Sequence, residues 1–141
     1  MKKIKILILA GIVLVVMFFV FGRIQNSYRV PDENTLIYEG DNEKDIWIDI
    51  AIQHKNGLMY LGSMLLRDSE PTMQDVVETL NNSDVGILIV VDNNGIIASV
   101  NQYPNSEMYN WNVYINNKRT EQNDINEIKV KDYDGITLMF E

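Results

Sequence analysis

One short amphipathic segment constrains the fold of this chain more than any other feature. Residues 72–80 place four apolar side chains at the spacing i, i+3, i+4 and i+7, which puts them on one face of a helix. These residues are Met73, Val76, Val77 and Leu80. Thr72 can cap the amino end, with Asp75 three residues later as in a capping box. Burying the four side chains would contribute roughly 6–12 kcal/mol, at about 1.5–3 kcal/mol each, so strands from the rest of the chain must cover them.

Alternating apolar residues predict those strands. In Ile46–Gln53 the four isoleucines share one face, while Asp49 and Gln53 share the other. Asn56-Gly57 is a strong hairpin signal, and the strand returns directly after it. The remaining predicted segments are a returning strand at 58–66, further strands at 85–91, 96–101, 111–115, 128–130 and 136–140, a loop at 102–110 and a polar loop at 119–127.

The order of these elements predicts an α+β fold. A hairpin, one short helix and several further strands imply a helix packed on a mostly antiparallel sheet. A hairpin followed by a crossing helix is also the opening of the β-grasp arrangement, so the predicted domain, residues 45–141, is β-grasp-like. Residues 25–44 are charged and rich in turn formers, which predicts a linker. Within it, Leu36–Tyr38 is apolar enough to dock as an edge strand.

The amino terminus predicts a transmembrane helix. Lys2, Lys3 and Lys5 precede an uninterrupted apolar run, Ile6–Phe21. A helix counted from 4 to 24 would span roughly 31 Å at about 1.5 Å per residue, close to the roughly 30 Å of a bilayer core. The sequence therefore predicts a membrane partner for this segment.

The end of the apolar run bears on whether it is retained. No A-x-A cleavage pattern follows it, and Arg23 stands directly after the one tolerable position. We therefore expect an uncleaved signal anchor over residues 1–24, with a cleaved signal peptide and a secreted domain as the alternative. Three lysines before the run against two arginines after it favour a cytoplasmic amino terminus. The protein is then a single-pass protein of the cell membrane with an extracytoplasmic carboxy-terminal domain.

Charge is divided sharply along the chain. The 141 residues carry a formal net charge of −8, but residues 30–141 hold seven basic and all twenty acidic residues, a formal charge of −13. Such a domain should be repelled by nucleic acid, because phosphate contacts dominate that affinity. The absence of cysteine excludes disulfides and thiolate metal sites. Asp41, Glu43 and Asp45 alternate, but the glycine and bidentate glutamate of an EF-hand loop are missing, so no metal site is predicted.

Residues able to carry chemistry are few. His54 is the single histidine, and its place before Asn56-Gly57 predicts a solvent-exposed turn residue. No Ser-His-Asp or Cys-His set can be assembled. Five carboxylates could pair, but each has a strand-surface, cap or turn explanation: Asp49, Asp75, Asp92, Asp132 and Asp134. We expect no enzymatic activity; a surface hydrolase that uses carboxylates is the rival from the enzyme class.

The aromatic residues around loop 102–110 are the candidate ligand- or partner-binding site. Tyr103, Tyr109 and Trp111 cluster there, and aromatic side chains near a loop can form a stacking or hot-spot surface. The structural alternative places Trp111 in the core with the tyrosines shielding its edge. The core is the favoured place for Trp111, and both interpretations stay open for the tyrosines.

Four short motifs follow the hairpin in a fixed order. They are Thr72-x-x-Asp75-Val76-Val77-x-x-Leu80, Ile97-x-Ser99-Val100-Asn101, Trp111-x-Val113-Tyr114-Ile115-Asn116 and Val130-x-Asp132-x-Asp134-Gly135-Ile136. In this order, from about Ile46 to the end, the chain resembles the transcobalamin-carboxy-terminal-like domain family of bacterial surface modules. Gln102 and Asn117 stand where the family usually has glycine, and Asp134-Gly135 inverts its usual Gly-Asp.

The resemblance bears on function only through the fold. In the vertebrate cobalamin carriers, the similar domain covers one face of the vitamin alongside a large helical domain, which is not expected in this chain. Cobalamin binding is therefore implied by fold analogy alone, and no cofactor is predicted from a site. We expect a membrane-anchored extracytoplasmic module that binds a protein or small ligand, with a corrinoid-like cofactor-binding accessory protein as the alternative.

Overall fold

The structure is a computed structural model that describes residues 29–141. Residues Glu33–Glu141 form one compact unit. Within the described residues no helix is long and apolar enough to cross a membrane, and the anchor expected over residues 1–24 lies outside them. The elements are β1 (Leu36–Glu39), β2 (Asp45–His54), β3 (Gly57–Arg67), α2 (Met73–Asn81), β4 (Ile89–Val91), β5 (Ile97–Val100), β6 (Tyr103–Pro104), β7 (Trp111–Ile115), β8 (Lys118–Arg119) and β9 (Gly135–Phe140).

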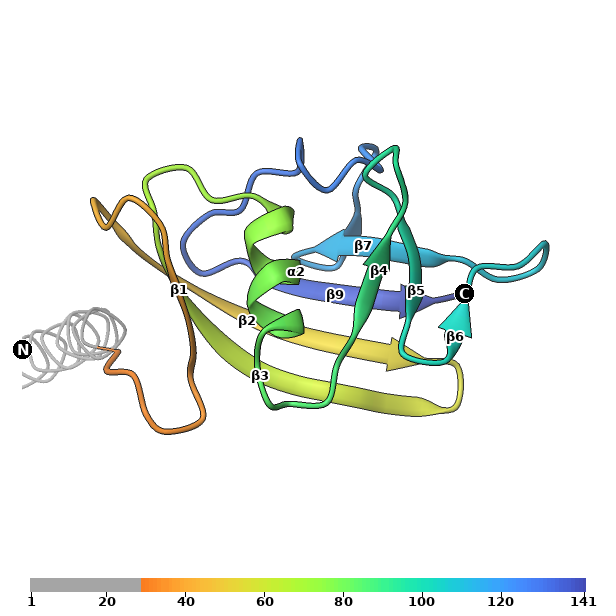
Figure 1. The fold of residues 1–141 in the computed structure, drawn as a ribbon, viewed down its shortest axis with the longest axis horizontal. Helices are drawn as coiled ribbons and strands as arrows, with labels where there is room; N and C mark the ends of the chain where they lie inside the picture. Colours follow the sequence, from red (N-terminus) through yellow and green to blue (C-terminus); the bar gives the residue numbers. More distant parts are fainter. Residues whose placement is uncertain (1–28) are drawn as a thin grey trace, which may run out of the picture. The chain divides into compact units, whose positions relative to one another are not determined.

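The strands form two sheets. The larger has the order β1-β3-β2-β9-β7-β8 and the smaller the order β4-β5-β6. β2 and β3 make the predicted antiparallel hairpin, while β9 joins β2, and β1 joins β3, in parallel. The other pairings are antiparallel. The predicted class, one short helix on mostly antiparallel strands, is therefore confirmed in the described residues (Figure 1).

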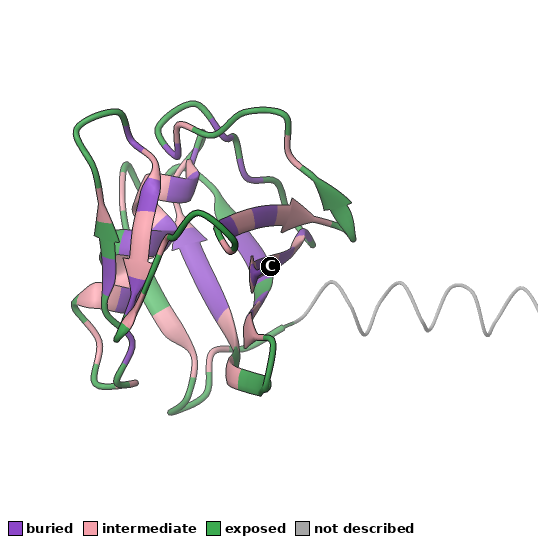
Figure 2. Cartoon of the chain, turned by 90° about the vertical axis from the view of Figure 1, so that its right-hand side faces the viewer, coloured by how far each residue is buried: buried purple, intermediate pink, exposed green. Residues whose placement is uncertain are grey.

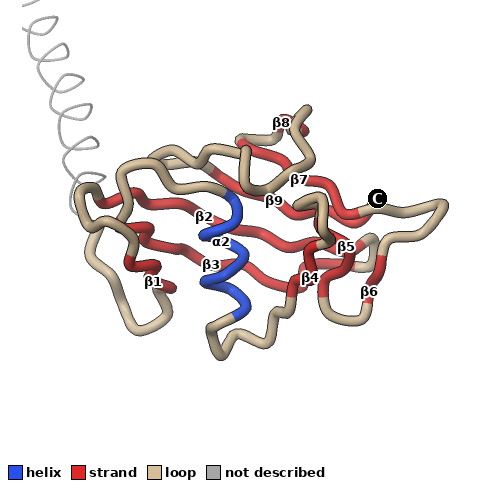
Figure 3. The backbone as a smooth tube through the Cα atoms, turned by 45° about the horizontal axis from the view of Figure 1, so that its top comes forward, coloured by secondary structure: helices blue, strands red, loops and turns tan. Residues whose placement is uncertain are grey.

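α2 covers one face of the larger sheet, and the smaller sheet lies beside it on the same face (Figures 1 and 3). The Thr72 backbone N–H donates to Asp75 Oδ2 at 2.7 Å, which fixes the start of the helix as the sequence predicts. The four apolar side chains of the helix are each 2 % exposed or less, whereas Gln74 is partly exposed. The predicted orientation of α2 is confirmed.

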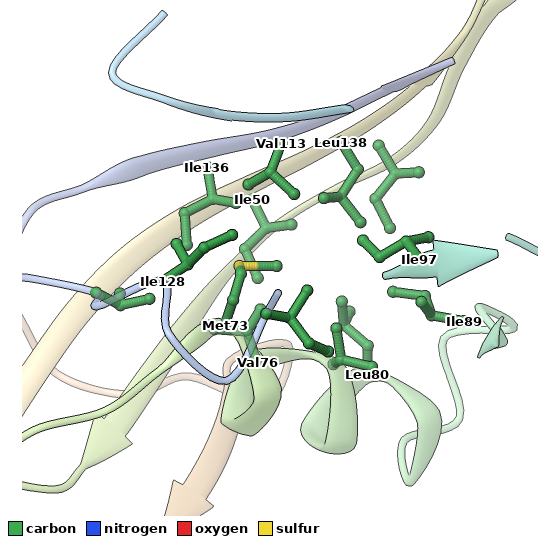
Figure 4. Packing of buried hydrophobic residues seen from close by; sticks show 14 of the residues in the cluster. Ile50, Met73, Val76, Leu80, Ile89, Ile97, Val113, Ile128, Ile136 and Leu138 are labelled. Atoms are coloured by element: carbon green, nitrogen blue, oxygen red, sulfur yellow. The ribbon is translucent and has the colours of Figure 1, made fainter. Parts of the chain in front are cut away.

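The core lies between α2, the smaller sheet and the covered face of the larger one. Figure 4 shows Met73, Val76 and Leu80 pointing from α2 toward side chains of the sheet. Exposed positions gather in turns and loops, while the strands carry most of the buried ones (Figure 2). Five sheet residues of this core are aliphatic and at most 1 % exposed, as expected of a closely packed interior: Ile48, Ile50, Ile52, Ile136 and Leu138.

Two predicted strands differ from the structure. β4 begins at Ile89 instead of residue 85, because Gly86 adopts φ +75° and breaks the extended backbone. Residues 128–130 form a single bridge, Thr72 to Lys129, instead of a full strand. Their backbone is used at the helix start, where Met73 N–H donates to the Ile128 carbonyl at 2.9 Å.

Part of the predicted linker belongs to the larger sheet. β1 pairs with Met64–Arg67, so the compact unit begins at Glu33 and not at residue 45. Leu36 and Tyr38 pack against the core, which explains why this stretch adds to the sheet. The edge strand predicted at Leu36–Tyr38 is therefore confirmed as β1.

Candidate ligand-binding site

Five ring-bearing residues from separate segments meet at one end of the larger sheet, which we call the aromatic end. β2 and β9 run parallel and finish there, and β7, antiparallel to β9, starts there. The small strand β6 and the loop after it supply the remaining members. The residues are His54, Tyr103, Tyr109, Trp111 and Phe140.

Phe140 is the hub of the aromatic end. Its ring centroid lies 5.0 Å from that of Trp111, 5.2 Å from that of His54 and 5.8 Å from that of Tyr109. The His54 and Tyr103 centroids are 4.1 Å apart, with the rings tilted by 32°. Most of these spacings fall in the range where aromatic pairs attract beyond simple area burial. The arrangement brings together the three candidate residues that the sequence indicates.

The members of the aromatic end differ in exposure. Trp111 and Phe140 are buried, at 5 % and 8 % exposed, whereas Tyr103, Tyr109 and His54 are half-buried. The Trp111 indole N–H donates to the Tyr103 carbonyl at 2.7 Å, so the buried ring also positions a half-exposed one. Trp111 therefore packs beneath the exposed part of the site as a buried ring, whereas the two tyrosines and the histidine are only half-buried.

The loop between β6 and β7 is held by local hydrogen bonds. Ser106 Oγ accepts the Tyr109 N–H at 3.1 Å, and the Ser106 N–H donates to the Tyr109 carbonyl at 2.8 Å. Met108 at its tip is 77 % exposed. Lys55 places its Nζ 4.4 Å from the Tyr109 ring centroid, a cation–π contact. The loop thus offers an apolar side chain and a ring, and the turn between β2 and β3 places a cation over that ring.

His54 is not the solvent-exposed turn residue that its place in the sequence predicts. It is the last residue of β2, pairs with Gly57 and stacks half-buried on Phe140 at an interplanar angle of 16°. Its Nδ1 accepts the Asn56 N–H at 3.3 Å. His54 continues the alternation of the isoleucines by one further step, and this signal could have placed it on the core face.

The described residues hold no group of three or more His, Cys, Asp or Glu side chains able to bind a metal ion. Asp41, one of the alternating acids, instead closes a turn: its Oδ1 accepts the Ser69 N–H at 2.9 Å and the Glu43 N–H at 3.0 Å. The hydrogen bond from the Ser69 hydroxyl lowers the pKa of the Asp41 carboxyl. Asp41 therefore has a structural role in this turn.

The five carboxylates considered for catalysis all accept hydrogen bonds that hold the fold. The donors are the Ser63 hydroxyl for Asp49 at 2.7 Å and backbone N–H groups for the others: Thr72 for Asp75 at 2.7 Å, Asn94 for Asp92 at 2.8 Å, Trp47 for Asp132 at 2.9 Å and Lys131 for Asp134 at 2.8 Å. Asp134, at 8 % exposed, is the buried one, and Asn116 Nδ2 also donates to it at 2.8 Å. These contacts support the cap, turn and strand explanations of the carboxylates.

Two solved structures share the fold of this chain. One is haptocorrin in complex with Cbi, with a TM-score of 0.59 and 10 % identity over 73 % of this chain. The other is a protein of Ruminococcus gnavus ATCC 29149, provisionally named as metal-binding, with a TM-score of 0.50 and 13 % identity over 68 % of this chain. At these identities the similarity establishes the fold alone. No protein-family profile and no curated protein matches the chain.

The two similarities differ in extent. The match covers 96 % of the R. gnavus protein but 26 % of haptocorrin, so the chain corresponds to about a quarter of haptocorrin. The predicted resemblance to the transcobalamin type of domain is thereby supported at the level of fold. Haptocorrin is solved in complex with Cbi and the R. gnavus protein is provisionally named as metal-binding, so both neighbours are associated with a ligand.

Proposed function

We propose that this chain is a membrane-anchored, extracytoplasmic module that binds a protein or small ligand and has no enzymatic activity. Within the proposal the domain is β-grasp-like, because a hairpin is followed by a crossing helix and the central pair β2 and β9 is parallel. The binding site is the aromatic end. Phosphate-rich partners are disfavoured by the formal charge of −13 over residues 30–141.

The observation that carries this proposal is the meeting of half-exposed rings over a buried ring support. Tyr103 and Tyr109 come from β6 and from the following loop, yet both lie on Phe140. Tyrosine offers large contact area at low entropic cost, and its hydroxyl can bond a partner. The exposed Met108 next to them adds an adaptable apolar contact.

A pull-down with residues 30–141 tests this function. The wild-type fragment, the double variant Tyr103→Ala/Tyr109→Ala and the matched control Tyr133→Ala would be compared, with captured partners identified by mass spectrometry. Tyr133 is 54 % exposed and lies in the turn before β9. We expect a partner retained by wild type and by Tyr133→Ala but lost from the double variant. Unfolding of the double variant would instead assign both tyrosines to the core.

A second candidate function, binding of a corrinoid-like cofactor, is favoured by the structural similarity to haptocorrin. Cobalamin and cobinamide would be titrated against residues 30–141 while absorbance and thermal unfolding are recorded. A ligand that binds the native state raises the unfolding temperature with concentration. A shift that Tyr109→Ala removes would support this candidate, and the absence of any spectral or thermal shift at high ligand would discard it.

The membrane location and the absence of catalysis have their own tests. Mass spectrometry of the mature amino terminus separates a retained anchor from a cleaved signal peptide, and the retained form is expected. Screening residues 30–141 against glycans and esters, with Asp49→Asn and Asp132→Asn variants, addresses the rival hydrolase. Turnover that these variants abolish would overturn the non-enzymatic assignment.

A further inference from the structure

β1 ends the larger sheet and leaves one side of its backbone open. The Gly40 N–H donates to the Arg67 carbonyl of β3 at 3.0 Å, which fixes the direction of the groups at residue 40. Because successive residues of a strand direct their N–H and C=O to opposite sides, those of Ile37 and Glu39 point away from β3. No described strand pairs with that side of β1.

A groove of about 350 Å³ lies along this open strand. Its walls are β1 on one side and the carboxy-terminal part of α2 on the other, where Glu78 and Thr79 line it. The volume falls in the range of small binding clefts. A strand added to β1 would lie about 4.8 Å from it, alongside the helix. The side chain of Ile37, 42 % exposed, supplies apolar surface at the same edge.

The charge at this groove is negative. Glu39 and Glu78 line it, and the described lining contains no lysine or arginine. Arg67 compensates Glu39 through a 2.6 Å contact. Glu78 accepts a hydrogen bond from the uncharged Gln74 Nε2 at 2.6 Å, and among the described residues it makes no ion pair. The pKa of Tyr38, which also lines the groove, is raised to about 12. The largest cause is its hydrogen bond with Asp75, followed by burial and by the negative charges of Asp75, Asp68 and Glu78.

We propose that β1 is a docking edge for an extended segment of a partner protein that carries lysine or arginine. The segment pairs through its backbone with Ile37 and Glu39 and directs a basic side chain to Glu78. Main-chain pairing at an exposed edge is a recurrent way of binding extended peptides, with side-chain pockets adding specificity. A second copy of this chain fits less well, because it would bring Glu78 of both copies to the same interface. This site is separate from the aromatic end and does not depend on it.

The test uses the full chain in detergent micelles and a short fluorescent peptide that alternates lysine and valine. Binding is followed by anisotropy, with a peptide that alternates glutamate and valine as control. Ile37→Pro removes the outward N–H and leaves the β1–β3 hydrogen bonds in place, since proline is tolerated where the N–H faces solvent. Glu78→Gln removes the charge while keeping the shape, and Glu107→Gln, in the exposed loop after β6, is the matched control.

The expected result is saturable binding of the basic peptide that weakens with salt. Ile37→Pro should abolish it, Glu78→Gln should weaken it roughly twofold to fivefold as for an exposed ion pair, and Glu107→Gln should leave it unchanged. Equal binding of the acidic peptide, no saturable binding of the basic one, or full binding by folded Ile37→Pro would overturn the proposal. Self-association of the wild type that Ile37→Pro removes would also overturn it, since the occupant would then be a second copy. Should Ile37→Pro fail to fold, Glu78→Gln still decides the role of charge.

Discussion

The covered face of α2 and the aromatic end are packed against the same sheet in two different ways. Under α2 the side chains are aliphatic and almost wholly excluded from solvent. At the aromatic end a buried pair, Trp111 and Phe140, supports rings that stay half-exposed and carry polar atoms. The first arrangement yields stability, because the apolar area removed from water is large. The second leaves surface available, so a substitution there can change binding at a smaller cost in stability.

The largest effect is expected in the core under α2. Leu80→Ala removes a fully buried side chain and should lower the free energy of unfolding by about 2–5 kcal/mol. The matched control is Gln74→Ala on the partly exposed face of the same helix, expected to change it by about 0.5 kcal/mol or less. Urea unfolding of residues 30–141 measures both. Equal losses would contradict the difference between the two faces of the helix.

Trp111 belongs to both regions, and replacing it should have an intermediate effect. Trp111→Phe keeps an aromatic ring but loses the hydrogen bond to the Tyr103 carbonyl and some packed volume. We expect a loss of about 1–3 kcal/mol in unfolding free energy together with weaker ligand binding. Unfolding and binding are measured on the same preparation. A binding loss without any stability loss would place Trp111 in direct contact with the ligand.

The half-exposed rings should separate stability from binding. Tyr109→Ala is expected to lower the unfolding free energy by roughly 1 kcal/mol, well below the effect of Leu80→Ala, while removing partner capture. Lys55→Ala, which removes the cation over the Tyr109 ring, should weaken capture less. Both are checked by urea unfolding and pull-down. A stability loss as large as that of Leu80→Ala would assign Tyr109 to the core.

The smallest effect concerns Tyr38, a residue of β1 that forms a hydrogen bond with Asp75 of α2. Its pKa is raised from 10.0 to about 12, first by the hydrogen bond with Asp75. The folded state therefore holds this proton more tightly than the unfolded state does. The resulting stability is present below pH 10 and is lost as the pH rises from about 10 to about 12. Tyr38→Phe should flatten that part of a curve of unfolding free energy against pH, and an unchanged slope would contradict the contact.

The helix α2 and the strands that it covers could be predicted because their sequence patterns are local. Three patterns each predict an element from a few neighbouring residues: the isoleucines of Ile46–Ile52, the helical spacing of 73–80 and the alternation of Trp111–Ile115. The structure confirms all three with little change in bounds. Patterns of period two do not say which strands pair, so the division into a six-stranded and a three-stranded sheet could not be predicted.

The aromatic end could be predicted only in part, since its members meet through pairing between distant segments. Tyr103, Tyr109 and Trp111 are close in sequence, so the sequence alone predicts them as a group. His54 and Phe140 join them because β2 and β9 pair in parallel and finish at the same end of the sheet, and this pairing has no local signal in the sequence. The groove beside β1 cannot be predicted from local patterns either, because it depends on where α2 lies over the sheet.

Photo-crosslinking in cells that express the full chain can show whether a partner contacts the aromatic end. A benzophenone amino acid would replace either Met108, at the aromatic end, or Leu88, which precedes β4 and is 56 % exposed. We expect a discrete adduct from position 108, seen on gels or by intact mass, that Tyr103→Ala/Tyr109→Ala removes, and none from position 88. Equal adducts from both positions, or none from 108, would contradict a binding surface at the aromatic end.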